Sequence, residues 1–300
     1  MITITIRQMQ YFEALAQTLH FGRAAELAGV SQPALSSQIA EMEEKLGCAL
    51  FERGRQVRLT EDALALLPRI ESVLAQLRDI EGMARRGRPA MEGRFRLGII
   101  PTVAPYLLPQ ILPVLRQRYP GLRVELREAI TATLVEEGAA GRIDAFVAAT
   151  PLDFPGLVTD DLFADRFFLA VPVDDPGFVD PPVPPDSLAL ERLMLLEEGH
   201  CLREQALAVC RTVKPVIMAN YGATSLTTLL QMVAHGLGVT LIPEMAARSA
   251  EQASGIRIVP FADPMPARQL CLAWRRSSPR HNECAELAGV IRGLHGRLRR

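Results

Sequence analysis

The sequence predicts an α/β protein with a helical N-terminal part and a larger part in which strands and helices alternate. Two observations lead to this prediction. Apolar residues recur at helical spacing through about the first 85 residues, and beyond the basic segment 85–89 short apolar strands alternate with helices. The chain has 300 residues, of which 49% are hydrophobic, so we expect about two domains with cores of their own.

The N-terminal part is predicted to contain three short helices and a small hairpin. The third helix has Ser31 as its N-cap and Pro33 in its first turn, where a missing N–H costs little, and Gly47 ends it. The apolar stripe of this helix consists of Leu35, Ile39, Met42 and Leu46. The segment 53–59 is predicted to form the hairpin, with basic residues at its tip.

A long helix is predicted from Glu61 to about Arg86. Its apolar residues follow the 3-4-3 rhythm of a coiled-coil seam, and they are Leu67, Ile70, Leu74 and Leu77. Because Pro68 lies inside this segment, we expect a kink there or two separate helical pieces. The break in the pattern at 85–89 predicts a domain boundary.

The rest of the chain is predicted to form parallel strands connected by helices. Strand patterns lie at 94–99, 122–126 and 143–149. A second block begins near Leu162, and its apolar segments are 167–171, 193–196, 216–219 and 239–242. One strand and a closing helix follow Arg268.

Composition and charge exclude several classes of protein. With 33 basic and 34 acidic residues the net charge is −1, which excludes a protein that coats nucleic acid by charge alone. No apolar run is long enough for a membrane span, and the first residues lack the basic flank and apolar centre of a signal peptide. We therefore expect a cytoplasmic protein without a structural disulfide framework, although the chain has five cysteines.

The segment from Phe21 to Thr60 carries a dense set of motif residues. They are Phe21-Gly22-Arg23-Ala24-Ala25, Val30-Ser31-Gln32-Pro33-Ala34-Leu35-Ser36, Ile39, Glu43, Leu46-Gly47, Leu50-Phe51-Glu52-Arg53 and Leu59-Thr60. This set strongly resembles the winged helix-turn-helix of LysR-type transcriptional regulators, and the order of the later elements also fits that family.

The resemblance implies a winged helix-turn-helix with a long linker helix, then a two-lobed α/β regulatory domain like that of periplasmic binding proteins. The implied bounds are 1–60 for the DNA-binding domain, 61–88 for the linker and dimerisation helix, and 89–300 for the regulatory, redox-sensing domain. Lobe I would comprise about 89–160 and 266–300, and lobe II about 161–265.

The third helix has a surface that suits a DNA groove. Ser37 lies nearly opposite the apolar stripe, and Pro33 and Ser36 also lie off it, so small side chains would allow close approach to the major groove. Arginines at the domain surface are candidates for phosphate contacts. The predicted DNA-binding residues are Arg23, Ser31, Gln32, Pro33, Ser36, Ser37, Arg53 and Arg55. From periodicity alone, an ordinary helical bundle with a solvated polar face is an equally good interpretation.

A second motif lies in the regulatory part. It consists of Leu195-Leu196-Glu197-Glu198-Gly199-His200-Cys201-Leu202-Arg203, with Cys210 nine residues after Cys201, and of the stretches 100–109 and 223–226. These residues resemble the redox centre of the OxyR subfamily, whose members sense hydrogen peroxide, with Glu204 at a position where the subfamily usually has Asp. The resemblance implies that Cys201 is the peroxide-reactive thiol, that Cys210 is the resolving thiol, and that Thr102 could hold peroxide through its hydroxyl.

If oxidation joins Cys201 and Cys210, the segment that carries them would act as a redox switch. On a continuous helix Cys201 and Cys210 would lie roughly 13.5 Å apart along the axis, whereas a disulfide needs Cα atoms within roughly 7 Å. A bond between them would therefore require the helix to unwind. A helix N-terminus, His200 and Arg203 each favour the thiolate of Cys201, which peroxide would oxidise to a sulfenic acid.

Two threonines are the remaining candidates for the peroxide site. Thr102 and Thr131 are predicted to begin helices at strand ends, where open α/β sheets bind ligands. For the two cysteines the alternative is a pair of buried packing thiols, which their spacing alone would favour. The context Gly199-His200-Cys201-Leu202-Arg203 favours the redox pair instead.

The sequence thus leaves three functional hypotheses. The first is a peroxide-sensing activator that binds double-stranded DNA half-sites as a homo-oligomer, a dimer of dimers or homotetramer, and acts with RNA polymerase. The second is a metabolite-binding LysR-type regulator with incidental cysteines, and the third, which the DNA-binding pattern disfavours, is a thiol peroxidase. We expect no enzyme activity, no cofactor, no membrane association and no metal site, since neither Cys-x-x-Cys nor His-Glu-x-x-His occurs.

Overall fold

The computed structural model describes residues 3–54, 56–84, 91–152, 154–174, 181–184, 187–209, 223–251 and 255–298. The chain forms two compact units, Met1–Gly87 with Ala140–Arg142, and Arg88–Ala139 with Ile143–Arg300. Within the described residues no helix is both long and apolar enough to cross a bilayer.

The first unit is a winged helix-turn-helix. Its elements are α1 (Ile6–Thr18), α2 (Phe21–Ala28), α3 (Gln32–Leu46), β1 (Phe51–Arg53), β2 (Val57–Leu59) and α4 (Glu61–Ala84). The antiparallel hairpin of β1 and β2 is called the wing below. Phe12, Leu15, Leu35, Ile39 and Met42 are fully buried and form the centre of the core.

The predicted limits of α3 are confirmed. The Ser31 hydroxyl accepts a hydrogen bond from the backbone N–H of Ala34, Pro33 lies in the first turn, and Gly47 ends the helix with a left-handed φ of 72°. The carbonyl groups at the end of α3 are bonded by the Gly47 N–H, which glycine permits without a Cβ clash.

The predicted seam on α4 serves the first unit itself. Ile70 and Leu74 are buried in its core, and Leu67 and Leu77 are partly buried against that core. α4 is a single helix through Pro68, so of the two predicted alternatives the two separate pieces are wrong, and a kink stays a prediction. Contacts on both sides of the proline outweigh the one hydrogen bond that it removes.

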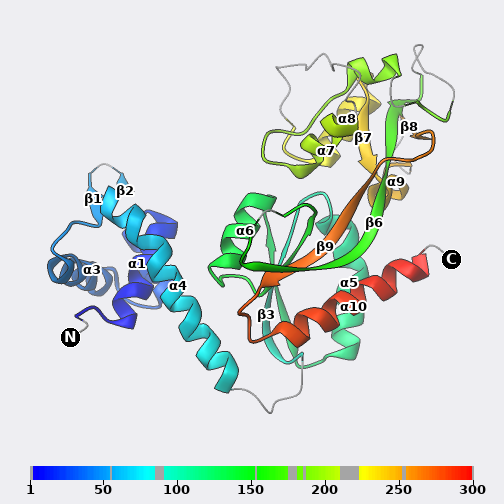
Figure 1. Ribbon diagram of the computed structural model, residues 1–300. Coiled ribbons are helices and arrows are strands. Elements are labelled where there is room, and N and C mark those ends of the chain that lie inside the picture. Colours follow the sequence, from blue (N-terminus) through cyan, green and yellow to red (C-terminus); the bar gives the residue numbers. More distant parts are fainter. Residues whose placement is uncertain are drawn as a thin grey trace. The chain divides into compact units, whose positions relative to one another are not determined.

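The second unit is built on one sheet in the order β4-β3-β5-β9-β6-β7, with β8 also paired to β6 (Figure 1). The strands are β3 (Gly93–Ile99), β4 (Leu122–Glu128), β5 (Ala145–Ala149), β6 (Leu157–Pro172), β7 (Thr240–Pro243), β8 (Ile256–Pro260) and β9 (Ala267–Arg275). The helices are α5 (Ala104–Arg118), α6 (Thr131–Ala139), the 3-10 helix η1 (Leu188–Arg192), α7 (Cys201–Val209), α8 (Leu226–Ala234), α9 (Glu244–Glu251) and α10 (His281–Leu298).

The sheet is mixed, whereas the sequence predicted a parallel one. β3 is parallel to β4 and β5, but β9 runs antiparallel to β5 and β6, and β6 runs antiparallel to β7 and β8. The segment 193–196 contributes single bridges at Leu193 and Leu196 rather than a strand, and 216–219 lies outside the described residues.

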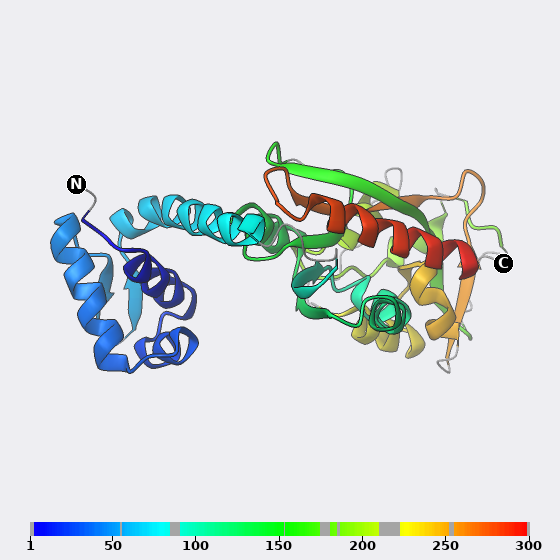
Figure 2. The ribbon, with the colours of Figure 1, turned by 90° about the horizontal axis from the view of Figure 1, so that it is seen from below.

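Two hydrophobic cores contain residues of the long strand β6. The first surrounds Phe95, Phe146 and Trp274, and the second surrounds Phe167 and Phe261. We call the parts around them lobe I and lobe II, and their boundaries stay a prediction. β6 pairs with β9 over Leu157–Arg166 and then with β7 and β8, so one continuous strand serves both lobes. α10 packs against β6, β9 and α5 (Figure 2).

Candidate functional site

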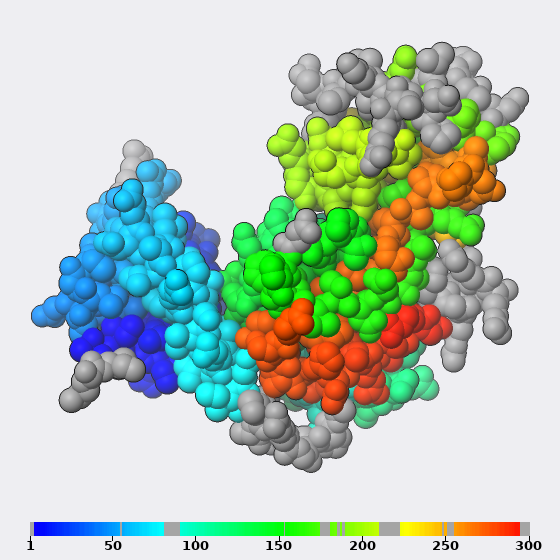
Figure 3. Space-filling view, in the orientation of Figure 1, coloured from blue at the N-terminus to red at the C-terminus, as the bar shows by residue number. Residues whose placement is uncertain are grey.

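Cys201 is the first residue of α7, and a glycine turn places it there. Gly199 has a left-handed φ of 90°, and a Cβ at this position would lie 3.0 Å from Cδ1 of Ile130. Glycine therefore lets the turn approach lobe I closely. Cys201 is a free, half-buried thiol that packs against the lobe I core. In Figure 3 the yellow-green segment that contains Cys201 borders the green atoms of lobe I.

The residues predicted to act with Cys201, which are His200, Arg203 and Glu204, differ in burial and in hydrogen bonding. The guanidinium of Arg203 donates a hydrogen bond of 3.0 Å to the carbonyl of Leu196. The backbone N–H of Arg203 donates to the carbonyl of His200. Arg203 thus fastens the start of α7 to the segment before it. His200 is half-buried and Glu204 is exposed. Cys210 lies outside the described residues.

Thr102 is held by an arginine, Arg268, for which the sequence predicted no role. Arg268 on β9 donates from Nη1 to the Thr102 hydroxyl at 2.9 Å and from Nη2 to the Thr102 carbonyl at 3.3 Å. The prediction that Thr102 begins a helix is wrong, because α5 starts at Ala104 and Thr102 lies in the turn before it. This turn lets both oxygens of Thr102 face the guanidinium.

Arg268 is paired with Asp165, and both side chains are completely buried. Nε of Arg268 donates to Asp165 Oδ2 at 3.0 Å, while Oδ1 accepts from the backbone N–H of Met245 at 3.1 Å. A buried charge needs such partners because burial removes its hydration. The sequence did hold a signal, since Asp165 and Arg268 are charged residues that closely precede apolar strand segments.

Thr131 is the first residue of α6, as predicted. Its hydroxyl oxygen is buried and has no hydrogen-bond partner among the described residues. Because Ile130 contacts the turn at Gly199, the structure brings Thr131 close to the segment that leads into Cys201. A buried hydroxyl without a partner is a polar group available to a small ligand.

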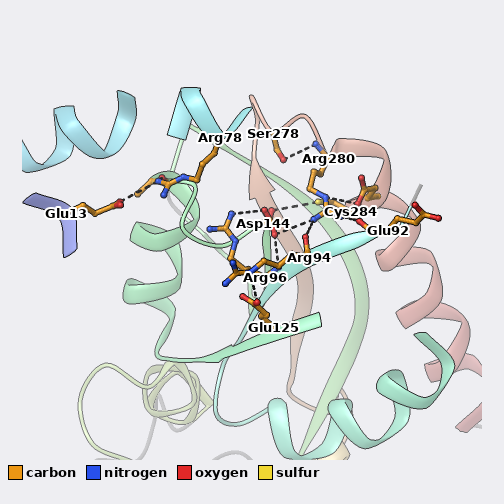
Figure 4. Close-up of polar contacts among 12 residues, drawn as sticks. Glu13, Arg78, Glu92, Arg94, Arg96, Glu125, Asp144, Ser278, Arg280 and Cys284 are labelled. Carbon is orange, nitrogen blue, oxygen red and sulfur yellow. Dashed lines mark hydrogen bonds and ion pairs between the residues drawn. The ribbon is translucent and has the colours of Figure 1, made fainter. Parts of the chain in front are cut away.

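Two further cysteines differ sharply from Cys201. Cys271 and Cys284 are fully buried, and burial raises the pKa of Cys271 to about 12 and that of Cys284 still further above its usual range. The Cys284 thiol lies 3.9 Å from the carbonyl of Asp144, whose carboxylate bonds Arg96 and pairs with Arg280 (Figure 4). These thiols are packed and protonated at neutral pH, as expected of structural cysteines.

The candidate DNA-binding surface combines α3 with the wing. The stripe residues Leu35, Ile39 and Met42 are buried, while the predicted contact residues are accessible. Among them Arg23, Ser31, Gln32, Pro33, Ser37 and Arg53 are exposed, and Ser36 is half-buried. Arg55 lies outside the described residues. Arg53 forms an ion pair with Glu43 on α3, which is a residue of the motif without a predicted role.

No group of three or more His, Cys, Asp or Glu within the described part of the chain could hold a metal ion.

Comparisons with known proteins agree with this architecture. Residues 6–64 match the family model "Bacterial regulatory helix-turn-helix protein, lysR family", and residues 89–294 match "LysR substrate binding domain". A probable hydrogen peroxide-inducible genes activator of Streptomyces viridosporus is 40% identical over 96% of this chain and 93% of its own.

Two solved structures extend the similarity. Full-length OxyR of Pseudomonas aeruginosa, with a cysteine replaced by aspartate, has a TM-score of 0.80 and 35% identity over 97% of this chain and 96% of its own. A cysteine-to-serine variant of Corynebacterium glutamicum OxyR, bound to H2O2, has a TM-score of 0.66 and 32% identity over 98% and 93%. The chain therefore belongs to the LysR family of bacterial transcription regulators, and within it to the OxyR group, rather than to a family of enzymes.

Proposed function

We propose that this chain is a DNA-binding activator that hydrogen peroxide switches through oxidation of Cys201 and formation of a disulfide with Cys210. The observation that carries the proposal is the position of Cys201, a half-buried free thiol at the start of α7. A helix N-terminus favours an anionic group, and a reactive thiol must also be accessible. Cys271 and Cys284 are fully buried and therefore lack this accessibility.

The proposed reaction balances with peroxide as its oxidant. The Cys201 thiolate attacks one oxygen of H2O2, the O–O bond breaks, and hydroxide leaves and is protonated to water. The Cys210 thiol then displaces water from the sulfenic acid and forms the disulfide. Two thiols have lost two electrons and two protons, and one peroxide has become two water molecules.

Two hydroxyl groups are proposed to assist by binding peroxide. Because Arg268 donates to the Thr102 oxygen, the hydroxyl proton of Thr102 is left to donate to a peroxide oxygen. The unpartnered hydroxyl of Thr131 is a second proposed contact. Arg203 holds the turn before Cys201, while His200 and Glu204 are proposed to border the site.

Formation of the disulfide requires α7 to unwind. Cys201 and Val209 are the two ends of α7, so they lie roughly 12 Å apart along the helix axis. Cys210 is bonded directly to Val209, and a disulfide needs Cα atoms within roughly 7 Å. We propose that this rearrangement shifts the subunits of a dimer of dimers and respaces the DNA-binding domains for RNA polymerase.

On DNA, α3 is proposed to lie in the major groove with Gln32, Ser36 and Ser37 toward the bases. Ser31 and Pro33 allow its N-terminal end to approach closely, and Arg23, Arg53 and Arg55 contact phosphates. Two domains on paired half-sites then supply the affinity that a net charge of −1 does not.

The intermediate is expected to be trappable in Cys210→Ser. Without the resolving thiol, the Cys201 sulfenic acid should persist, and dimedone should add to it once per chain, as measured by mass spectrometry. Wild type should instead give the intramolecular disulfide and little adduct. If wild type keeps all its thiols with stoichiometric peroxide while a metabolite shifts DNA binding, the metabolite-binding alternative is correct.

The dimer is expected to use the exposed side of α4. Val73 and Ile80 are 41% and 62% exposed and lie within about 20° of one another around the helix. Ile80→Asp should raise the dimer dissociation constant at least about tenfold by removing one buried apolar contact. Leu64, 57% exposed on the other side of α4, supplies the control Leu64→Asp. Equal effects of the two variants in sedimentation experiments would contradict this dimer surface.

A further inference from the structure

Glu43 on α3 fastens the base of the wing. Its Oε1 accepts hydrogen bonds from the backbone N–H groups of Leu50 and Phe51 at 2.8 and 3.1 Å. The carbonyl of Leu50 in turn accepts from the backbone N–H of Thr60 at 3.1 Å, where the wing ends. One carboxylate oxygen therefore sets the start of β1 relative to α3.

The second oxygen of Glu43 holds Arg53. Nη2 of Arg53 lies 2.9 Å from Oε2 of Glu43, and its guanidinium carbon lies 5.7 Å from the ring centre of Phe21 on α2. The Glu43 side chain is 16% exposed, whereas that of Arg53 is 48% exposed. A guanidinium has five N–H groups, so one bond to Glu43 leaves donors for another anion.

We propose that Glu43 is a positioning residue for DNA binding, which holds the Arg53 guanidinium in place to receive a DNA phosphate. This inference rests on the proposed phosphate contact of Arg53. A long side chain that is already oriented loses less freedom when it binds than a mobile one. The Glu43 carboxylate also repels the phosphate. This repulsion lowers the affinity for DNA, whereas the orientation of Arg53 raises it.

The test uses the full chain with Glu43→Gln, which keeps an amide oxygen for Leu50 and Phe51 and removes the charge that pairs with Arg53. The matched control is Glu44→Gln, the same charge change at an exposed position of the same helix. Binding to a fluorescein-labelled duplex of mixed sequence is measured by anisotropy over a series of salt concentrations. We expect Glu43→Gln to weaken binding about 3- to 10-fold, the cost of immobilising one long side chain, and Glu44→Gln to leave it unchanged or tighter.

Arg53→Ala completes a double-mutant cycle. Loss of one phosphate contact should reduce the salt slope by about 0.9, and adding Glu43→Gln to Arg53→Ala should cause no further weakening. If Glu43→Gln weakens DNA binding equally with and without Arg53, Glu43 serves wing stability alone and the inference is overturned. Equal DNA affinities of Glu43→Gln and Glu44→Gln would also overturn it. An unchanged salt slope in Arg53→Ala would overturn the phosphate contact as well.

Discussion

Cys201→Ser is expected to abolish the loss of thiols and the change in DNA binding that stoichiometric peroxide causes. In wild type the count of free thiols should fall from five to three per chain as the Cys201–Cys210 disulfide forms. A serine hydroxyl is not ionised at neutral pH and cannot form a disulfide, so the first step of the reaction is lost. The measurement is a thiol titration of the denatured chain, in parallel with binding to the DNA target.

Cys48→Ser is the matched control for this experiment. Cys48 is also a half-buried free thiol, but it lies in the DNA-binding unit, against the core of that unit. The Cys48→Ser chain should still change its DNA binding with peroxide and should still lose two thiols. A Cys201→Ser chain that still loses two thiols to one equivalent of peroxide would show that another cysteine is the sensor.

Asp165→Ala is expected to lower the free energy of unfolding of the second unit, called the regulatory unit here, by about 3–5 kcal/mol. The substitution leaves the charge of Arg268 buried without the carboxylate that pairs with it. Both side chains are completely buried, so water cannot replace the missing partner. The free energy of unfolding is measured by urea denaturation of the full chain, with the transition of the regulatory unit assigned by Trp274, the single tryptophan.

The same strand offers the control. Asp160 on β6 pairs with Arg292 at 2.5 Å, but the two side chains are 30% and 40% exposed. Asp160→Ala should therefore cost less than about 1 kcal/mol. Asp165→Leu combined with Arg268→Met should recover most of the stability that Asp165→Ala loses, because no unpaired charge remains. Equal costs for Asp160→Ala and Asp165→Ala would contradict the importance of burial here.

The sequence predicted the elements whose signals are local. The N-cap, proline and terminal glycine of α3 act within a few residues, and the structure confirms all three. α8 also begins at a local signal, since the hydroxyl of Ser225 accepts a hydrogen bond from the backbone N–H of Thr228. Such signals require no knowledge of the rest of the fold.

The sheet topology could not be predicted in this way. Alternation of apolar residues reports which face of a strand is buried, but it does not identify the strand's partner. Only the apolar second half of β6 was predicted, because its first half carries charges and a register shift between Asp161 and Phe163. The isolated bridges at Leu193 and Leu196 form with segments 46 and 27 residues away, so local sequence patterns could not predict them.

The candidate sites likewise contain residues that a local motif predicts and residues that only the fold brings together. The motif around Cys201 is continuous in sequence and was predicted, whereas Arg268 and Asp165 are 103 residues apart and meet only because β6 pairs with β9. The role of Glu43 required the position of the wing, which lies seven to ten residues further along the chain.

The packing of Cys201 against the core of lobe I has a consequence for the reversal of the proposed switch. If disulfide formation unwinds α7, the contacts that the reduced thiol and α7 make are lost on oxidation, so they stabilise the dithiol state alone. Free energy that favours the dithiol raises the reduction potential of the couple. The packing of α7 would then oppose oxidation by peroxide and favour reduction by a cellular thiol.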